Sequence, residues 1–146
     1  MIPRPQRRRK PAAAPPVYEA ETQGVTVRVT PDYLPNQSDP GRGAYVWAYQ
    51  VEIENRGARE IQLVSRHWVI TDGLNRTEEV NGPGVVGEQP SLKPGEAYRY
   101  VSACPLTTPS GLMHGAYRML TPDGDCFDVA IPVFSLDLPQ AGKRPN

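Results

Sequence analysis

Apolar residues recur at every second position in two early stretches of the chain. In residues 25–30, three valines alternate with threonine and arginine. In residues 45–54, tyrosine, tryptophan, valine and isoleucine take the odd positions, while glutamine and glutamate take positions 50, 52 and 54. A period of two matches the alternation of side chains along a strand that has one buried and one solvated face. The pattern therefore predicts two β-strands whose odd-numbered residues point into the core.

Residues 61–72 (IQLVSRHWVITD) form a third apolar stretch, but here the apolar residues occupy both odd and even positions. This pattern is typical of a central strand or of a strand that carries a β-bulge. We expect Trp68 and Ile70 to point inward, which places Arg66 on the same side of the strand and His67 on the opposite side.

The second half of the chain contains four further predicted strands, over residues 77–80, 97–104, 115–120 and 127–138. In the last of them, the inward positions change from odd to even numbers, ending at Leu138, and Pro132 between the two sets indicates a bulge or bend. Residues 82–95 contain four glycines and three prolines, so we expect a long loop and no helix there.

This succession of short strands and turns predicts an all-β fold. Turn signals separate the strands every 8–12 residues or so, and no amphipathic helix is visible. We expect about seven or eight antiparallel strands in a two-sheet β-sandwich of the immunoglobulin or fibronectin type III kind.

The chain has 146 residues, the length of one ordinary domain, and its charges are divided unevenly. Overall, 16 Lys and Arg balance 16 Asp and Glu, but residues 1–16 hold five basic residues and no acidic one. The remainder therefore has 11 basic and 16 acidic residues, a net charge of −5. We predict a disordered basic arm rich in Pro, Ala and Arg over residues 1–17, a domain over 18–138 and a flexible tail over 139–146.

The charge distribution argues against nucleic acid as a partner of the domain. The acidic body lacks the continuous basic face that broad nucleic-acid binding requires, and the basic run at residues 7–10 gives the arm at most a weak affinity for nucleic acid. The chain shows neither the apolar run of a signal peptide nor the roughly 18 apolar residues of a membrane helix. We expect a soluble, cytoplasmic protein with no membrane insertion.

The cysteines and histidines predict no metal site. Cys104 and Cys126 are the only cysteines, and their spacing matches neither a Cys-x-x-Cys redox pair nor a zinc site. We expect both to be small buried apolar residues. His67 and His114 stand at no short ligand spacing from them, and no residue has the context of a catalytic nucleophile. No cofactor and no catalytic residue is predicted.

Four runs of residues resemble the ApaG family in the same order along the chain: IQLVSRHWVITD (61–72), EVNGPGVVGEQPSLKPGEAYRY (79–100), CPLTTPSGLMHGAYRM (104–119) and FDVAIPVFSLD (127–137). The resemblance covers about residues 18–138. It implies a fibronectin type III-like sandwich, found alone in bacteria and as a C-terminal module of some eukaryotic F-box and DNA-polymerase-interacting proteins. The family has no agreed biochemical activity. Its members are linked genetically to cobalt resistance and magnesium efflux. These links are associations, so the resemblance implies no catalytic residue.

Residues 82–87 (GPGVVG) match the letters of the dinucleotide-binding motif G-x-G-x-x-G, whose glycines let backbone amides approach a pyrophosphate. A Rossmann site also needs a helix directly after the motif, and the prolines at positions 90 and 94 oppose one. The loop is then either a backbone anion site outside any Rossmann fold, an edge that binds a protein partner, or a glycine-shaped loop for close packing. The candidate anion- or partner-binding residues are Gly82, Gly84, Val85, Val86, Gly87, Glu88 and Gln89.

Arg66 and His67 form a second candidate, a polar surface site. The Arg66 guanidinium has the chemistry to stack on Trp68 or to anchor an acidic partner, and equally to hold Glu79 or Asp72 within the fold. His67 is expected to be a polar strand residue and not a proton-transfer group.

Three functions follow from these candidates. The one we favour is a non-catalytic protein–protein interaction module, with a protein partner of unknown identity, because a long loop is joined to a chain without a convergent acid, base and nucleophile. The first alternative is nucleotide-pyrophosphate binding, of ATP or a diadenosine polyphosphate, through residues 82–87. The second is an accessory factor in cobalt or magnesium efflux that acts indirectly. The sequence leaves homo-oligomerisation open.

Overall fold

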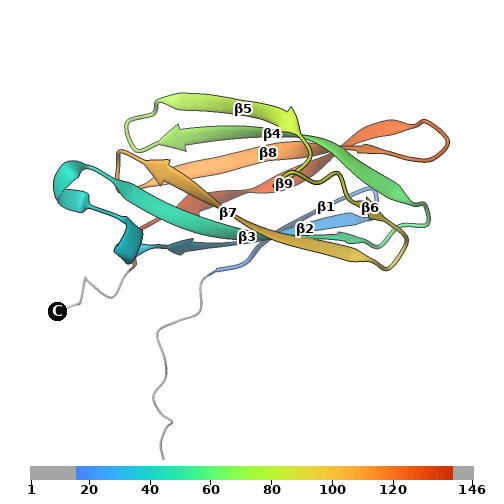
Figure 1. The fold of residues 1–146 in the computed structure, drawn as a ribbon, viewed down its shortest axis with the longest axis horizontal. Helices are drawn as coiled ribbons and strands as arrows, with labels where there is room; N and C mark the ends of the chain where they lie inside the picture. Colours follow the sequence, from blue (N-terminus) through green and yellow to red (C-terminus); the bar gives the residue numbers. More distant parts are fainter. Residues whose placement is uncertain (1–15, 140–146) are drawn as a thin grey trace, which may run out of the picture.

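The computed structural model describes residues 16–139, which form two antiparallel sheets packed face to face (Figure 1). The first sheet has the strand order β1-β2-β3-β7 and contains β1 (Tyr18–Thr22), β2 (Val25–Tyr33), β3 (Tyr45–Asn55) and β7 (Ala97–Leu106). The second has the order β5-β4-β8-β9 and contains β4 (Ile61–Asp72), β5 (Thr77–Pro83), β8 (Gly111–Leu120) and β9 (Cys126–Leu136), with β6 (Ser91–Leu92) beside the start of β4. The predicted all-β sandwich is confirmed.

The connection from β2 to β3 contains two short 3-10 helices, Pro35–Gln37 and Pro40–Arg42. The predicted basic arm over residues 1–17 and the predicted tail over residues 139–146 lie outside the described residues, apart from positions 16, 17 and 139.

The two stretches in which apolar and polar residues alternate form β2 and β3, the central strands of the first sheet. Val27 pairs with Ile53 and Val29 pairs with Val51, and all four side chains are fully buried. Full burial of an aliphatic side chain of this size stabilises the fold by about 1.5–3 kcal/mol. The predicted inward direction of the odd-numbered residues is confirmed for both strands.

β4 carries a bulge and is also a central strand of its sheet, so both explanations offered for its apolar pattern apply. Leu63 pairs with Met119 and Ser65 pairs with Arg118, so Val64 is an extra residue without a partner in β8. One extra residue in a strand moves the inward side from odd to even positions. This shift explains why apolar residues occupy both parities in this stretch of the sequence.

The predicted sides of β4 are also confirmed. Trp68 is buried, and Arg66 lies on its side of the strand, where both residues line a cleft between the sheets. His67 lies on the outer face of the second sheet, as expected, and its side chain is partly exposed.

Pro132 lies at a bulge in β9, as predicted. β9 has two residues, Pro132 and Val133, where β8 has only His114 between matched pairs. The inward positions accordingly change from odd to even, and Phe134 is fully buried. Leu138 was expected to continue this inward set, but it is exposed because β9 ends at position 136.

The cysteine prediction is correct for Cys104 and wrong for Cys126. Cys104 is buried in β7, whereas Cys126 is exposed at the first residue of β9. The reason is positional, because the inward residues at this end of β9 are odd-numbered, so Cys126 belongs to the outer face.

The sequence did not predict β1 or β6, and the predicted loop is shorter than expected. Residues 82 and 83 complete β5, and residues 91 and 92 form β6, so the loop proper spans residues 84–90. β1 has the sequence YEAET, whose alternation is too weakly apolar to identify, and it pairs along its whole length with β2.

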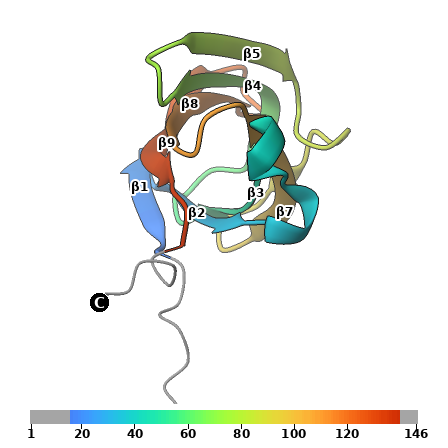
Figure 2. The same cartoon turned by 90° about the vertical axis from the view of Figure 1, so that its left-hand side faces the viewer.

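The two long edges of the sandwich differ (Figure 2). On one side β1 lies against β9, where the Ala130 amide donates to Thr22 Oγ1 at 3.1 Å and the hydroxyls of Tyr18 and Ser135 are 3.4 Å apart. On the other side the end strands are β5 and β7, which do not pair with each other. This open edge contains the candidate site.

Candidate binding cleft

A cleft of about 400 Å³ opens between β5 and β7. Its walls come from both sheets and from the turn after β5, and its lining is mainly aromatic and aliphatic, with a few polar groups at the mouth. This volume and composition are typical of a ligand-binding cavity. Representative lining residues are Tyr49, Trp68, Val80, Val85, Tyr100 and Cys104.

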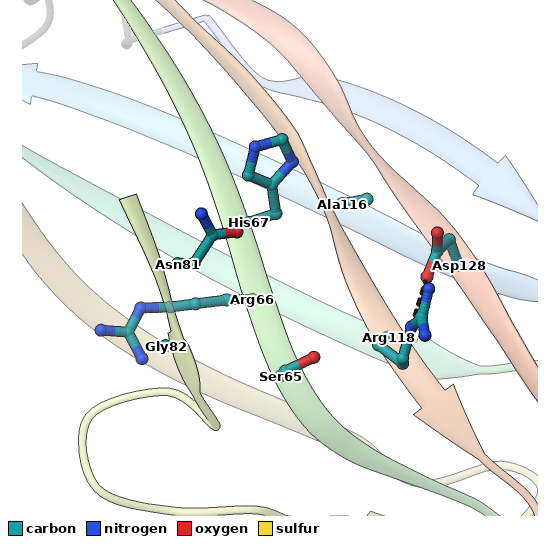
Figure 3. Close-up of a pocket in the computed structure, with 8 residues that line it drawn as sticks. All are labelled: Ser65, Arg66, His67, Asn81, Gly82, Ala116, Arg118 and Asp128. Atoms are coloured by element: carbon teal, nitrogen blue, oxygen red, sulfur yellow. Dashed lines mark hydrogen bonds and ion pairs between the residues drawn. The ribbon is translucent and has the colours of Figure 1, made fainter. Parts of the chain in front are cut away.

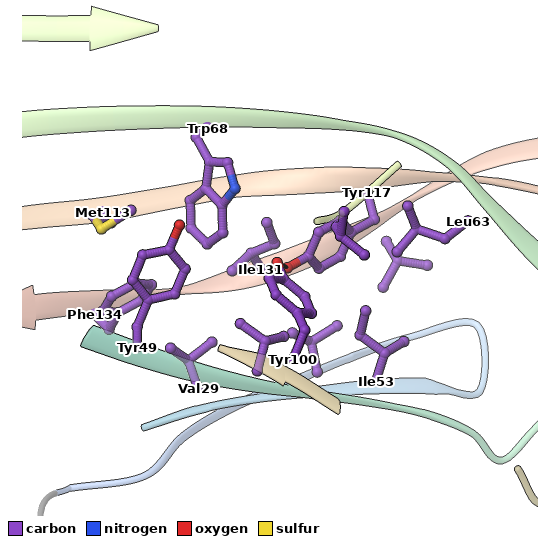
Figure 4. Close-up of a cluster of buried hydrophobic side chains, with 14 of the residues drawn as sticks. Val29, Tyr49, Ile53, Leu63, Trp68, Tyr100, Met113, Tyr117, Ile131 and Phe134 are labelled. Carbon is purple, nitrogen blue, oxygen red and sulfur yellow. Dashed lines mark hydrogen bonds between the residues drawn. The ribbon is translucent and has the colours of Figure 1, made fainter. Parts of the chain in front are cut away.

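The inner wall of the cleft is a rigid aromatic cluster (Figure 4). The Trp68 ring meets Tyr49 edge-on, with ring centroids 5.3 Å apart, and meets Phe134 at 5.9 Å. The hydroxyls of Tyr100 and Tyr117 hydrogen-bond to each other inside the core. Aromatic pairs in such geometry stabilise by about 0.5–1.5 kcal/mol beyond their buried area. The cleft is therefore preformed by the core.

The titratable groups of this wall are neutral near pH 7. Burial raises the pKa of Tyr100 and of Tyr117 well above the usual range for a tyrosine. Burial, with a smaller contribution from the negative charge of Glu78, raises the pKa of the Cys104 thiol to about 11. A protonated thiol is a poor nucleophile.

Arg66 fixes the turn at the end of the cleft. Its Nη1 atom donates to the carbonyl oxygen of Pro83 at 3.0 Å and to that of Gly84 at 2.9 Å. A side chain at Gly82 would lie 2.9 Å from Arg66 Nη2, so glycine at this position leaves room for the guanidinium (Figure 3). Arg66 thus contacts backbone oxygens of its own fold.

The predicted alternatives for Arg66 as a partner of Glu79 or Asp72 are wrong. Glu79 accepts a hydrogen bond from His67 at 3.1 Å, and Asp72 is held by Arg76 at 2.7 Å. Arg66 is on the inner side of β4 and cannot reach the outer-face carboxylate as His67 does.

The turn over residues 84–88 is a tight hairpin. The amide of Val85 donates to the carbonyl of Glu88 at 2.8 Å, and the amide of Glu88 returns a bond of 2.8 Å. The two residues between them, Val86 and Gly87, have φ values of 42° and 82°, the left-handed geometry of a type I′ turn. Val85 is buried and anchors the turn to the core, while Val86 at the tip is 57% exposed.

Val86 is an unusual residue for this position. Asn and Gly are preferred where φ is positive, and a β-branched residue there is a conformational outlier. The left-handed conformation costs an L-residue about 1–2 kcal/mol. Val86 therefore stores backbone strain at the rim of the cleft.

The same turn is a poor phosphate cradle. The amides of Val85 and Glu88 bond to each other's carbonyls, and the Gly84 amide donates to Val64 at 3.0 Å. The Gln89 side chain also donates to Val64, at 2.8 Å, so it braces the turn and does not face a ligand. Residues 91–92 after the turn form a strand and not the helix that a dinucleotide motif requires.

A shallow polar depression of about 400 Å³ lies on the outer face of the second sheet (Figure 3). His67 and Asn81 border it, and Arg118 forms a salt bridge with Asp128 at 3.1 Å on its opposite side. Arg66 borders both hollows because it passes over Gly82, but its guanidinium is fixed by the turn. Arg66 and His67 thus belong to opposite faces of β4 and do not form one compact site.

Among residues 16–139, no cluster of three or more His, Cys, Asp or Glu side chains could hold a metal ion. Within the same described range, no helix is long and apolar enough to cross a membrane.

The comparisons with known proteins assign the family. A family model for the ApaG domain matches residues 35–121. The chain belongs to the ApaG domain family. Protein ApaG of Caulobacter vibrioides is 56% identical over 139 residues, which cover 95% of this chain and 99% of that protein. Protein ApaG of Paramagnetospirillum magneticum is 55% identical over 130 residues, covering 89% of this chain and all of that protein.

Solved structures agree with the ApaG assignment. A crystal structure of the ApaA protein from Bordetella pertussis has a TM-score of 0.78 and 48% sequence identity, and it covers 88% of this chain and 99% of that one. The C-terminal domain of wzt has a TM-score of 0.52 with 12% identity, which is a likeness of fold alone. None of these names specifies an activity or a ligand.

Sequence reasoning found the turn and Arg66 but missed the cleft. Tyr100 and Glu78 belong to strands that are not neighbours in either sheet, and they face each other only because the sheets stack. The left-handed conformation of Val86 was also missed, since valine carries no turn signal; only the glycine that follows hinted at it.

Proposed function

We propose that this ApaG domain is a non-catalytic binding module that takes up an extended segment of a partner protein along the free edge of β7. The observation that carries the proposal is an edge strand whose central residues carry neither charge nor proline, directly beside a cleft lined mainly by aromatic and aliphatic residues. Addition of a strand to an exposed sheet edge is a common mode of peptide recognition, with main-chain hydrogen bonds for affinity and adjacent pockets for specificity.

The hydrogen bonds of the first sheet indicate which backbone groups are free. The Asn55 amide donates to Glu96, just before β7, and the Val46 carbonyl accepts from Leu34 on the β2 side. Bonded positions alternate along antiparallel strands. The odd residues of β3 therefore bond to β7, and the even residues bond to β2.

The same alternation continues across β7. Tyr98 pairs with Ile53, an odd residue of β3, so even residues of β7 direct their backbone toward β3. The amides and carbonyls of Arg99, Val101 and Ala103 point to the open edge, in position for an added strand.

The two edge strands, β5 and β7, differ in the features that protect them against pairing with an added strand. Natural edge strands are usually blunted by charges, prolines or covering segments. β5 carries Glu78 and Glu79 and ends at Pro83. β7 also contains Arg99 and Pro105, but its central residues 100–104 carry neither charge nor proline, and Val101 among them is 60% exposed. β7 is therefore the edge on which an incoming strand meets least opposition.

The chemistry of the cleft supports a non-catalytic role. The Cys104 thiol is protonated at neutral pH, and the hydroxyls of Tyr100 and Tyr117 are engaged with each other. Nucleotide-pyrophosphate binding is supported less well, since three backbone amides of the turn already have partners. An indirect role in cobalt or magnesium efflux stays a prediction, with no structural feature that favours it.

A displayed library of random twelve-residue peptides tests the proposal. Peptides are selected on the full-length chain and measured against Val101→Pro, which removes one outward amide, and against Val101→Lys, in case the proline variant is unfolded. We expect enriched peptides to bind Val101→Pro at least tenfold more weakly and to slow hydrogen exchange of the Val101 amide in the complex.

Leu112→Lys is the matched control, because Leu112 is an exposed apolar residue on an inner strand, β8, of the other sheet. This variant should bind like the unmodified chain. Peptides that bind all three variants equally, or a failure to enrich any peptide, would contradict strand addition at β7.

A further inference from the structure

We infer that Val86 is a specificity-determining contact for the bound segment, and that this segment places an aliphatic side chain against Val86 and a Lys or Arg beside Glu78. The inference rests on the proposed function, because it names the chemistry of the segment that β7 receives.

The first argument is the conformation of Val86. Its φ of 42° lies in the region that Asn and Gly adopt with little cost and β-branched residues avoid. Glycine already occupies the next position, so a Val86→Asn change would give Asn-Gly, the preferred pair for this turn. The turn therefore does not need valine for its geometry.

The second argument is that the fold gains little from the Val86 side chain. Val85 supplies the buried anchor of the turn, whereas Val86 is 57% exposed. What Val86 does contact is the cleft, whose wall it shares with Trp68 and Val80. Strain that nothing in the fold offsets is characteristic of residues kept for function. An apolar group at the rim of an apolar cleft is suited to cover a bound aliphatic side chain.

The third argument is charge. Glu78 lines the cleft and Glu88 ends the turn, and among the described residues neither has a cation within 4.0 Å. The nearby Arg66 is fixed by two backbone carbonyls of the turn and is not paired with either carboxylate. Among residues 16–139, the cleft lining therefore presents one unpaired carboxylate, Glu78, to a partner, while the Arg66 guanidinium is bound to the turn. Charge complementarity then selects a basic segment over an acidic one.

Two other segments compete for the same cleft, and the experiment distinguishes them from a partner protein. One is β7 of a second copy of the chain, and the other is the basic run at residues 7–10, which has the charge to approach Glu78. We commit to a segment of a different protein, because Arg99, the basic residue of β7, is already paired with Glu52 at 2.8 Å, and the basic run contains no aliphatic residue.

The test compares Val86→Asn, Val86→Thr and Val133→Thr in the full chain. Thermal unfolding and the affinity for the peptide most enriched on β7 are measured for each. Val86→Asn should raise Tm by about 3–6 °C, because it relieves the strain, and weaken the peptide about tenfold. Val86→Thr should leave the strain in place and weaken binding alone.

Val133→Thr is the matched control, since Val133 is 58% exposed but lies on β9, and it should change neither binding nor, by more than a degree or two, Tm. A Glu78→Gln variant should weaken the peptide about threefold, and a peptide with its basic residue changed to glutamate should bind more weakly still. A peptide bound equally by Val86→Asn would overturn the inference while leaving strand addition intact.

Two outcomes would assign another occupant and also overturn the inference. A dimer of the unmodified chain in analytical ultracentrifugation, lost in Val101→Lys, would identify a second copy. A chain beginning at Val17 that binds the peptide several-fold more tightly would identify the N-terminal arm as a competitor. If no peptide is enriched at all, the proposed function itself fails.

Discussion

The closed and open edges of this sandwich are built from strands of similar length and differ in what covers them. At the closed edge, β1 lies against β9, and a tyrosine ring packs on Phe134 at 6.1 Å. At the open edge, β5 and β7 leave a cleft with an aromatic wall and a strained turn at its rim. Among the described residues neither edge is closed by a strand ladder, so the comparison teaches that side-chain contacts between β1 and β9 are enough to cover one edge, and that without such contacts the other edge keeps a cleft.

The largest expected difference is between truncation of a buried core ring that packs on β1 and truncation of an exposed side chain on β7. Phe134→Ala removes a fully buried ring next to Tyr18, Tyr49 and Trp68, and should lower the free energy of unfolding by about 3–5 kcal/mol. Val101→Ala at the open edge should lower it by no more than about 0.5 kcal/mol. Urea unfolding measures both. Equal losses would mean that the open edge contributes to stability as much as the closed one.

An intermediate loss of stability is expected when the Arg66 guanidinium, which holds the turn, is removed. Arg66→Met keeps most of the side-chain stem and removes two hydrogen bonds to carbonyls, at a cost of about 1–3 kcal/mol. The matched control is Arg118→Met, whose salt bridge to the half-exposed Asp128 is screened by solvent, so its loss should destabilise the fold less than Arg66→Met does.

Arg66→Met should also weaken peptide binding, because the turn that carries Val86 would lose its support. Urea unfolding and peptide titration of both variants measure these effects. If Arg118→Met proves the more destabilising, Arg66 does not hold the turn.

The smallest effect is a difference in thiol reactivity with pH. The pKa of Cys104, at about 11, is two units above its ordinary value of 9.0, so its thiolate is about 100-fold scarcer than that of an ordinary thiol near pH 8. Iodoacetamide should modify the exposed Cys126 first, and modification of Cys104 should rise only as the pH approaches 11.

Mass spectrometry of the labelled chain, with Cys104→Ser as the control for assignment, measures the order. Modification of both cysteines at the same rate at pH 8 would show an ionised thiol in the cleft and would reopen the question of catalysis.

The strands could be predicted from the sequence to a large extent because their causes are local. The valines of β2 and the aromatic residues of β3 repeat with a period of two, and Pro132 marks a bulge that the backbone requires. The side on which Arg66 lies followed from counting back from Trp68 along one strand. Such inferences need only the geometry of a single strand.

The candidate site could be predicted only in part because its causes are not local. The sequence identified the glycine-rich turn, but the buried position of Val85 and the exposed tip at Val86 depend on how the turn folds onto the core. Cys126 was misassigned because cysteines are usually buried, although the odd inward positions of its own strand place it on the outer face.

The sequence by itself determined that this chain forms short strands with an apolar interior, where most of them lie, and that Pro132 marks a bulge or bend in the last of them. Tertiary structure alone decided that β1 covers β9 while β5 and β7 stay apart, because the strand order brings together residues that are far apart in the chain. The cleft exists for that reason. Its walls are specified residue by residue in the sequence, but their meeting depends on the stacking of two sheets, which no local pattern encodes.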